Sequence, residues 1–116
     1  MELLNKSDSE ILDIVTPIAK IMTEAWSNDD YDNFIKYFIE QNRKSLDLES
    51  FQTQRSWISE LGDYSLNKLV TLHKNPSNIV IVWKIAFANR SELGIGVYRF
   101  KEENNQVKTQ SCIYFQ

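Results

Sequence analysis

The spacing of apolar residues changes at the middle of the chain. Up to Gly62 they recur every three or four positions, which is the period of an amphipathic helix. After Asp63 the period is two, typical of strands with one buried face, and only turn-sized gaps separate the runs. This order predicts an α+β fold in which three N-terminal helices pack on one face of a four-stranded antiparallel curved meander sheet.

The first half carries start and stop signals for these helices. Ser7 and Glu10 have capping-box spacing ahead of an apolar stripe, so a first helix is predicted from about Asp8 to Ser27. Pro17 falls inside it and removes one backbone hydrogen bond, which predicts a kink or a break in the preceding turn.

Two shorter helices are predicted after it. The acidic segment 28–30 ends the first helix and caps a second, whose stripe is Tyr31, Phe34, Ile35 and Phe38. Asp47 caps a third helix, and Gly62 supplies its left-handed end.

Turn residues separate four strands and set their register. The strands are predicted at 64–74, 79–89, 93–101 and 106–115, with turns at 75–78, 90–91 and 104–105. If each turn is a tight hairpin, the residues of one face follow. The face assigned to the helices holds Leu66, Lys68, Val70, Leu72, Ile79, Ile81, Trp83, Ile85, Phe87, Gly94, Gly96, Tyr98, Phe100, Thr109, Ser111, Ile113 and Phe115.

Two glycines on that face are predicted to serve packing. Gly94 is placed opposite Phe87, and Gly96 between Ile85 and Ile113. Small residues beside large ones leave room for a helix or a ligand to approach the sheet.

The opposite face is too apolar for an ordinary wet surface. It holds Leu69, Thr71, His73, Val80, Val82, Lys84, Ala86, Ala88, Leu93, Ile95, Val97, Arg99, Gln110, Cys112 and Tyr114. A contiguous apolar patch on a small protein usually marks a partner surface. We therefore predict a homodimer through Val82, Lys84, Ile95, Val97 and Tyr114.

Composition narrows the function classes. The chain has 116 residues, which suits one domain spanning 1–116. Its net charge is −3 and its Lys and Arg residues are scattered, so the sequence has no basic patch of the kind that binds nucleic acid. Its longest uncharged apolar run, Ile79 to Trp83, is far too short to cross a membrane. Cys112 is the only cysteine, which excludes an internal disulfide. No signal peptide is visible, so a cytoplasmic location is expected, although a trimmed secreted chain would look the same.

Two segments carry a resemblance to a known superfamily. Residues 26–38, WSNDDYDNFIKYF, look like a helix end, an acidic stop and a short helix, and residues 57–64, WISELGDY, lead into the strands. This layout resembles the nuclear-transport-factor-2-like (cystatin-like α+β) superfamily, and most closely its small bacterial domains of unknown function. The resemblance implies a sheet-mediated dimer and a cone between helices and sheet that often holds a small molecule.

One departure from the superfamily affects the expected cone. No hairpin is visible between the second and third helices, where larger members have one, so one wall of the cone is thinner. The superfamily's dehydratases and isomerases place Asp, His or Tyr in the cone, and this sequence offers few such residues. A fold does not by itself imply a function.

We predict that any pocket lies among aromatic side chains. Trp26, Trp57, Trp83 and Tyr98 would line it, with Tyr98 and Ser111 as its polar contacts. The alternative for Tyr98 is a buried phenol satisfied within the core, and for the tryptophans ordinary core packing.

The other candidates have ordinary interpretations. His73 is the only histidine and is placed at the partner-facing side, while Lys68 is expected to extend outward from an edge strand. The aspartates around Asp30 lack the ligand alternation of a calcium loop and are expected to cap a helix. Cys112 has no basic neighbour and is expected to be an inert thiol. No metal or cofactor is predicted.

Three functions follow. The first is a non-catalytic homodimeric domain whose cone binds a small apolar ligand or serves as its core. The second is a protein-interaction module that uses an exposed sheet or helix face. The third, an enzyme of the dehydratase or isomerase type, is disfavoured because acid–base catalysis needs paired titratable groups, and only Tyr98, Lys68 and His73 are available.

Overall fold

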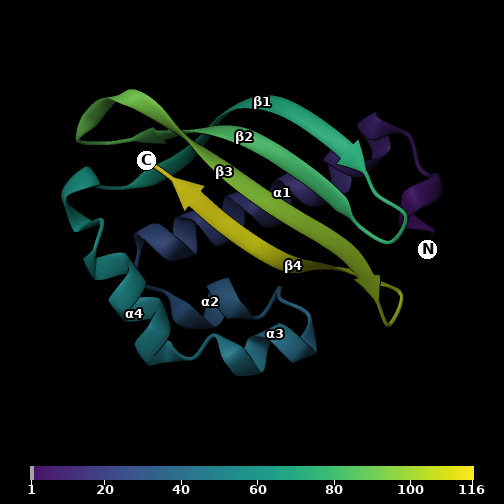
Figure 1. Ribbon diagram of the computed structural model, residues 1–116, viewed down its shortest axis with the longest axis horizontal. Helices are drawn as coiled ribbons and strands as arrows, with labels where there is room; N and C mark the ends of the chain where they lie inside the picture. The colour runs from purple at the N-terminus through teal and green to yellow at the C-terminus, as the bar shows by residue number, and fades with distance from the viewer. Residues whose placement is uncertain (1) are drawn as a thin grey trace.

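The fold is α+β, as predicted, with helices packed on one face of an open antiparallel sheet (Figure 1). The computed structural model describes residues 2–116, without the side chain of Ser59. The strands are paired in the order β1-β2-β3-β4, the predicted meander. The α-helices are α1 (Asp8–Ser27), α2 (Tyr31–Ile35), α3 (Glu40–Ser45) and α4 (Leu48–Ser56), and the strands are β1 (Tyr64–Lys74), β2 (Ile79–Phe87), β3 (Arg90–Glu103) and β4 (Gln106–Phe115).

Helix α1 has the predicted ends because its caps are local. The Ser7 hydroxyl accepts a hydrogen bond from the backbone N–H of Glu10, and the Glu10 carboxylate accepts one from the backbone N–H of Ser7. The helix runs without interruption through Pro17, so the alternative of a break is wrong. Pro17 lies on the exposed side, where water can satisfy the carbonyl group left without a donor.

The remaining helices differ from the prediction by one element. Helix α2 ends at Ile35, and the predicted third helix is α4, which Asp47 caps by accepting from the backbone N–H of Ser50. Gly62 has the expected left-handed backbone, with φ of 75°. Helix α3 was not predicted, because no residue of it is buried and its sequence therefore has no apolar period.

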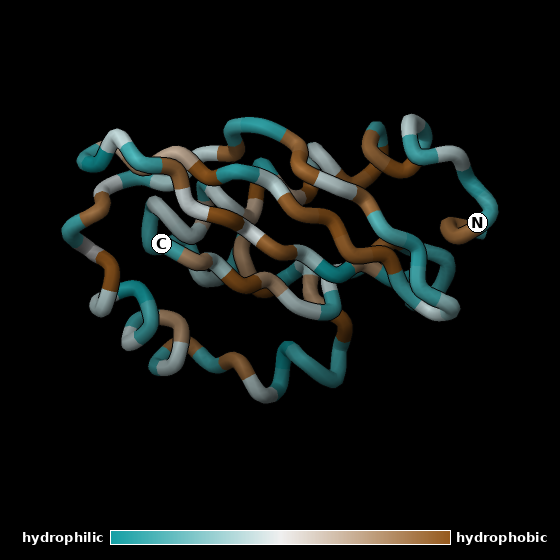
Figure 2. Tube along the Cα trace, turned by 45° about the horizontal axis from the view of Figure 1, so that its top comes forward, coloured by the Kyte–Doolittle hydropathy of each residue, from teal (hydrophilic) through white to brown (hydrophobic). Residues whose placement is uncertain are grey.

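Strands β2 and β3 present the predicted residues to the helices. Buried and partly buried residues alternate without exception along β2, and the buried ones are Ile79, Ile81, Trp83, Ile85 and Phe87. Gly94, Gly96, Tyr98 and Phe100 are the buried positions of β3. In Figure 2, hydrophobic colour follows these strands and hydrophilic colour marks the hairpin turns.

The turn between β2 and β3 lies two residues earlier than predicted. Phe87 pairs with Arg90, so the turn is at 88–89 instead of 90–91, and Gly94 stands opposite Ile85 instead of Phe87. The backbone N–H groups of Ala88 and Asn89 donate to the carbonyl groups of Asp63 and Leu61, which ties this turn to the connection before β1.

Strand β4 differs more seriously. Its turn is as predicted, with Glu103 opposite Gln106, but an irregularity follows at Gln110. Thr109 pairs with Phe100 and Ser111 pairs with Arg99, so the faces exchange beyond that point. The predicted inward placement of Ser111, Ile113 and Phe115 is therefore wrong, as is the outward placement of Cys112 and Tyr114.

The edge strand β1 also departs from simple alternation. Two register shifts flank Leu69, which pairs with Trp83 instead of lying on the outer face as predicted. Lys68 and Val70, which were assigned to the helix-facing side, are exposed. His73 pairs with Val80 and is exposed on the outer face, as predicted.

Within residues 2–116, no helix combines the length and the apolar character that crossing a bilayer requires.

Candidate functional site

A pocket of about 400 Å³ opens between α4 and the C-terminal end of β4. We call it the aromatic pocket. Helix α1 supplies one wall, the segment around α4 supplies the rim, and β4 supplies the floor. Its lining residues are Trp26, Phe34, Leu46, Gln54, Trp57, Ile58, Cys112, Ile113, Tyr114 and Gln116.

Ring packing fixes the wall of this pocket. The Trp26 ring centroid lies 5.5 Å from that of Phe34, 5.4 Å from that of Phe51 and 5.5 Å from that of Tyr114. Tilted and edge-on pairs at such separations are favourable beyond the area they bury. At the rim, by contrast, Trp57 follows α4 and is 75% exposed. The pocket therefore has a rigid wall and an indole at its mouth.

Tyr114, in the lining, belongs to a row of hydrogen-bonded hydroxyl groups whose other members are buried behind the pocket. The Tyr114 and Tyr98 hydroxyl oxygens are 2.6 Å apart, and the Tyr98 oxygen is 2.7 Å from Oγ1 of Thr23. The Thr23 hydroxyl donates to the carbonyl oxygen of Ala19 at 2.7 Å. A small residue opposite Tyr114, namely Gly96, leaves space for this arrangement.

Burial controls the titration of these groups. It raises the pKa values of Tyr98 and Tyr114 well above their ordinary range. It also raises the pKa of the Cys112 thiol to about 12. All three groups are therefore protonated at neutral pH, and the low reactivity of Cys112 stays a prediction.

The structure divides the five predicted ligand contacts. Trp26 and Trp57 line the aromatic pocket. Trp83 and Tyr98 are buried behind it, with ring centroids 5.3 Å apart in an edge-on arrangement. Ser111 pairs with Arg99 on the outer face, so its predicted position beside Tyr98 is wrong.

Sequence reasoning missed Cys112 and Tyr114 as pocket residues. Both point inward only because β4 contains the extra residue Gln110. A hairpin counted from its turn places them on the other face, and no local signal in β4 marks the irregularity. Tyr114 had been assigned to the dimer surface on that basis.

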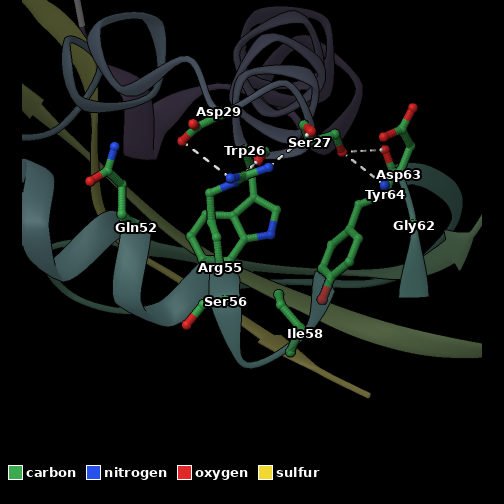
Figure 3. A pocket seen from close by; sticks show the side chains of 10 residues that line it. All are labelled: Trp26, Ser27, Asp29, Gln52, Arg55, Ser56, Ile58, Gly62, Asp63 and Tyr64. Carbon is green, nitrogen blue, oxygen red and sulfur yellow. Dashed lines mark hydrogen bonds and ion pairs between the residues drawn. The ribbon is translucent and has the colours of Figure 1, made fainter. Parts of the chain in front are cut away.

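A second pocket, of about 370 Å³, lies on the other side of Trp26 and Ile58 (Figure 3). Arg55 spans its mouth: Nε donates to the Trp26 carbonyl, Nη2 donates to the Ser27 carbonyl at 3.1 Å, and Nη1 lies 3.1 Å from a carboxylate oxygen of Asp29. These hydrogen bonds satisfy carbonyl groups at the C-terminal end of α1 that have no donor within the helix, so Arg55 serves as a helix cap.

The acidic segment beside this pocket also has a structural role. Asp30 accepts a hydrogen bond from the backbone N–H of Asn33 at the start of α2, which confirms that it caps a helix. Asp29 has a left-handed backbone, with φ of 58°, and its side chain pairs with Arg55.

Comparisons with known proteins agree on the fold. No protein-family model matches the sequence, and no curated protein does. An NTF-2-like protein of unknown function from Shewanella oneidensis MR-1 superposes with a TM-score of 0.64 at 10% identity, covering 88% of this chain and 96% of the other. A SEC-C motif containing protein from Rhodopseudomonas palustris gives a TM-score of 0.53 at 11% identity, covering 88% and 89%. The NTF-2-like α+β fold is therefore confirmed, at identities that show the fold alone.

Proposed function

We propose that this chain is a non-catalytic domain that binds a small apolar ligand in the aromatic pocket. The observation that carries the proposal is an open pocket of about 400 Å³ whose lining is mostly apolar and includes four aromatic side chains. This volume falls within the range of small-molecule sites, which are mostly apolar with a few placed polar groups. Trp57 at the mouth offers a large exposed surface that a ligand would cover.

The chemistry of the lining favours binding over catalysis. Its titratable side chains are Cys112 and Tyr114, and burial raises the pKa of both. A general base must accept a proton near neutral pH, which neither neutral group does readily. His73 and Lys68, the other candidates that the sequence offered, are exposed residues of β1 outside the pocket lining.

Calorimetric titration with 3-methylindole tests this proposal. We expect saturable binding to the wild type and clearly weaker binding to Trp57→Ala, because the substitution removes one side of the mouth. Leu48→Ala is the matched control, since Leu48 is exposed on α4 and is not part of the lining. The proposal fails if no saturable heat is seen, or if the two variants bind alike.

We propose further that the outer sheet face forms a homodimer. Four exposed apolar residues support it: Leu93 (43%), Ile95 (36%), Ile113 (50%) and Phe115 (55%). Ile113 and Phe115 lie on the face to which the sequence prediction assigned Tyr114, whereas Val82, Lys84, Ile95 and Val97 stay on that face with different partners across the strands. A standard interface buries about 800 Å² per subunit, and a contiguous exposed apolar patch on a small protein usually marks a partner surface.

Light scattering at high micromolar concentration tests the dimer. The wild type should have twice the mass of one chain, and Ile95→Asp, at an exposed position outside the aromatic pocket, should reduce it to one. Ser91→Asp, an exposed position outside the patch, should leave the mass unchanged. A wild-type monomer would instead favour the interaction module, in which this face recruits a different protein. The cytoplasmic location stays a prediction.

A further inference from the structure

The chain of hydroxyl groups behind the aromatic pocket has one direction. The contact between Thr23 Oγ1 and the Ala19 carbonyl can only be a bond in which threonine donates, because a carbonyl oxygen has no proton. Threonine has a single hydroxyl proton, so its oxygen must accept from Tyr98 at 2.7 Å. The proton of Tyr98 is thereby used.

Counting hydroxyl protons in the same way fixes the role of Tyr114, the third hydroxyl group. Tyr98 has given its proton to Thr23, so the 2.6 Å contact between the two phenols requires Tyr114 to donate to Tyr98. Tyr114 then has no proton left, and its oxygen keeps only lone pairs. Burial holds the pKa values of both phenols high, so no proton is lost from the chain near neutral pH.

Tyr114 is also the member of this chain that faces the ligand site. Thr23 and Tyr98 are fully buried, whereas Tyr114 is only partly buried and lines the aromatic pocket. Cys112, its neighbour in the lining, has only a weak S–H donor. The Tyr114 oxygen lies 2.6 Å from that of Tyr98 and 3.4 Å from Oγ1 of Thr23, and Tyr114 is the one residue of the three that lines the pocket. What its hydroxyl group has left to offer is an acceptor oxygen.

The lining also selects against charge. None of the side chains that line the aromatic pocket is ionised at neutral pH. A carboxylate moved from water into it would lose its hydration and gain no counter-ion, which is costly. An acceptor group placed against Tyr114 would gain no bond and would face another lone pair.

We propose that the ligand is an uncharged, largely apolar molecule that donates one N–H or O–H hydrogen bond to the Tyr114 hydroxyl oxygen. This inference rests on the proposed function and specifies the chemical class of its ligand. Tyr114 acts as a specificity-determining residue, and Thr23 and Tyr98 are positioning residues that fix the orientation of its proton.

Two isomeric probes test this selection. The compounds 3-methylindole and 1-methylindole are isomers of nearly the same size, but only the first has an N–H donor. By calorimetry we expect 3-methylindole to bind the wild type roughly three- to tenfold more tightly, the usual net value of one hydrogen bond. Indole-3-acetate, which keeps the N–H and adds a carboxylate, should bind more weakly than either.

Tyr114→Phe is the decisive variant. It keeps the ring and removes the acceptor oxygen, so the two methylindoles should bind it with equal affinity. Tyr37→Phe, on a partly buried tyrosine outside the pocket lining, is the matched control and should keep the wild-type preference. A far-ultraviolet circular dichroism spectrum confirms that both variants are folded.

The outcomes separate this inference from the proposed function. Equal binding of the two isomers to the wild type, or tighter binding of 1-methylindole, overturns the donor selection and leaves the aromatic pocket as a binding site. Tighter binding of indole-3-acetate than of 3-methylindole overturns the selection for an uncharged ligand. A preference that survives in Tyr114→Phe overturns the role of Tyr114. Absence of saturable binding by all three probes overturns the proposed function together with this inference.

Discussion

The β2–β3 and β3–β4 hairpins both contain an irregularity, and they differ in the number of extra residues. Between the pairs Ile85–Gly94 and Phe87–Arg90, β3 has three residues (91–93) where β2 has one (86), an excess of two. Between the pairs Phe100–Thr109 and Arg99–Ser111, β4 has one residue, Gln110, and β3 has none, an excess of one.

Whether the number of extra residues is even or odd decides which side chains of the strand face the helices. Side chains alternate between the two faces of a strand, so an even excess leaves each residue on its face and an odd excess exchanges the faces. Gly94 and Gly96 accordingly face the helices. In β4, the odd excess moves Cys112 and Tyr114 into the aromatic pocket and sends Ile113 and Phe115 to the outer face.

Contacts from distant segments hold Gln110 in place. Its carbonyl oxygen accepts a hydrogen bond from the Asn42 side chain of α3, and its side-chain oxygen accepts one at 3.0 Å from Asn78. The segment before α3 also pairs with β4: Thr109 donates to the Tyr37 carbonyl at 2.7 Å and accepts from the backbone N–H of Ile39 at 2.9 Å. The segment from Tyr37 to Asn42 is thus hydrogen-bonded to the edge strand β4 at the irregularity.

Thiol labelling gives the largest expected difference between the faces of β4. At pH 8, Cys112 should react with a disulfide reagent roughly a hundredfold or more slowly than a cysteine at position 113 in the double variant Ile113→Cys, Cys112→Ser. The thiolate is the reactive form, and raising the Cys112 pKa from 9.0 to about 12 makes it scarce. The Cys112 rate should rise steadily with pH above 8, because the thiolate fraction grows toward that pKa.

Comparable labelling rates at the two positions would show that β4 has the simple hairpin register. Labelling in denaturant is the control, since both thiols should then react at the same rate.

Substitution of the glycines tests the even register of β2–β3. A Cβ on Gly94 would collide with the Phe115 carbonyl oxygen, which is backbone, and would lie 2.6 Å from Cζ of Phe87. Gly94→Ala should therefore lower the free energy of unfolding by roughly 1–3 kcal/mol in urea titrations. Gly96→Ala should cost less, because its Cβ meets the flexible end of Ile85, at 2.9 Å from Cδ1.

An unchanged unfolding midpoint for Gly94→Ala, or a larger loss for Gly96→Ala than for Gly94→Ala, would contradict this packing.

Removal of the Asn42 side chain should have the smallest effect. Asn42→Ala deletes one hydrogen bond to the Gln110 carbonyl, so the free energy of unfolding should fall by about 1 kcal/mol relative to Gln41→Ala. The comparison with Gln41, an exposed neighbour on α3, allows for the higher helix propensity of alanine. Equal stability of the two variants would mean that Asn42 does not hold the irregularity.

The sequence by itself determined the elements whose signals are local. Helix α1 begins where Ser7 and Glu10 bond to each other across three residues, so its start follows from the printed letters. The β2 faces follow from strict alternation within one strand, and the β3–β4 turn follows from Asn104 and Asn105, both of which adopt positive φ.

Only the tertiary structure decided the turn at 88–89, the register of β4 and hence the aromatic pocket. The first is fixed by bonds to Leu61 and Asp63, and the second by bonds to Gln110 from Asn42 and Asn78, which are 68 and 32 positions away. The stretch from Gln106 to Phe115 has a reasonable alternation in either register, with apolar residues on both faces. The pattern of this stretch therefore does not distinguish the two registers. The register is set by hydrogen bonds that exist only after the helices have packed on the sheet.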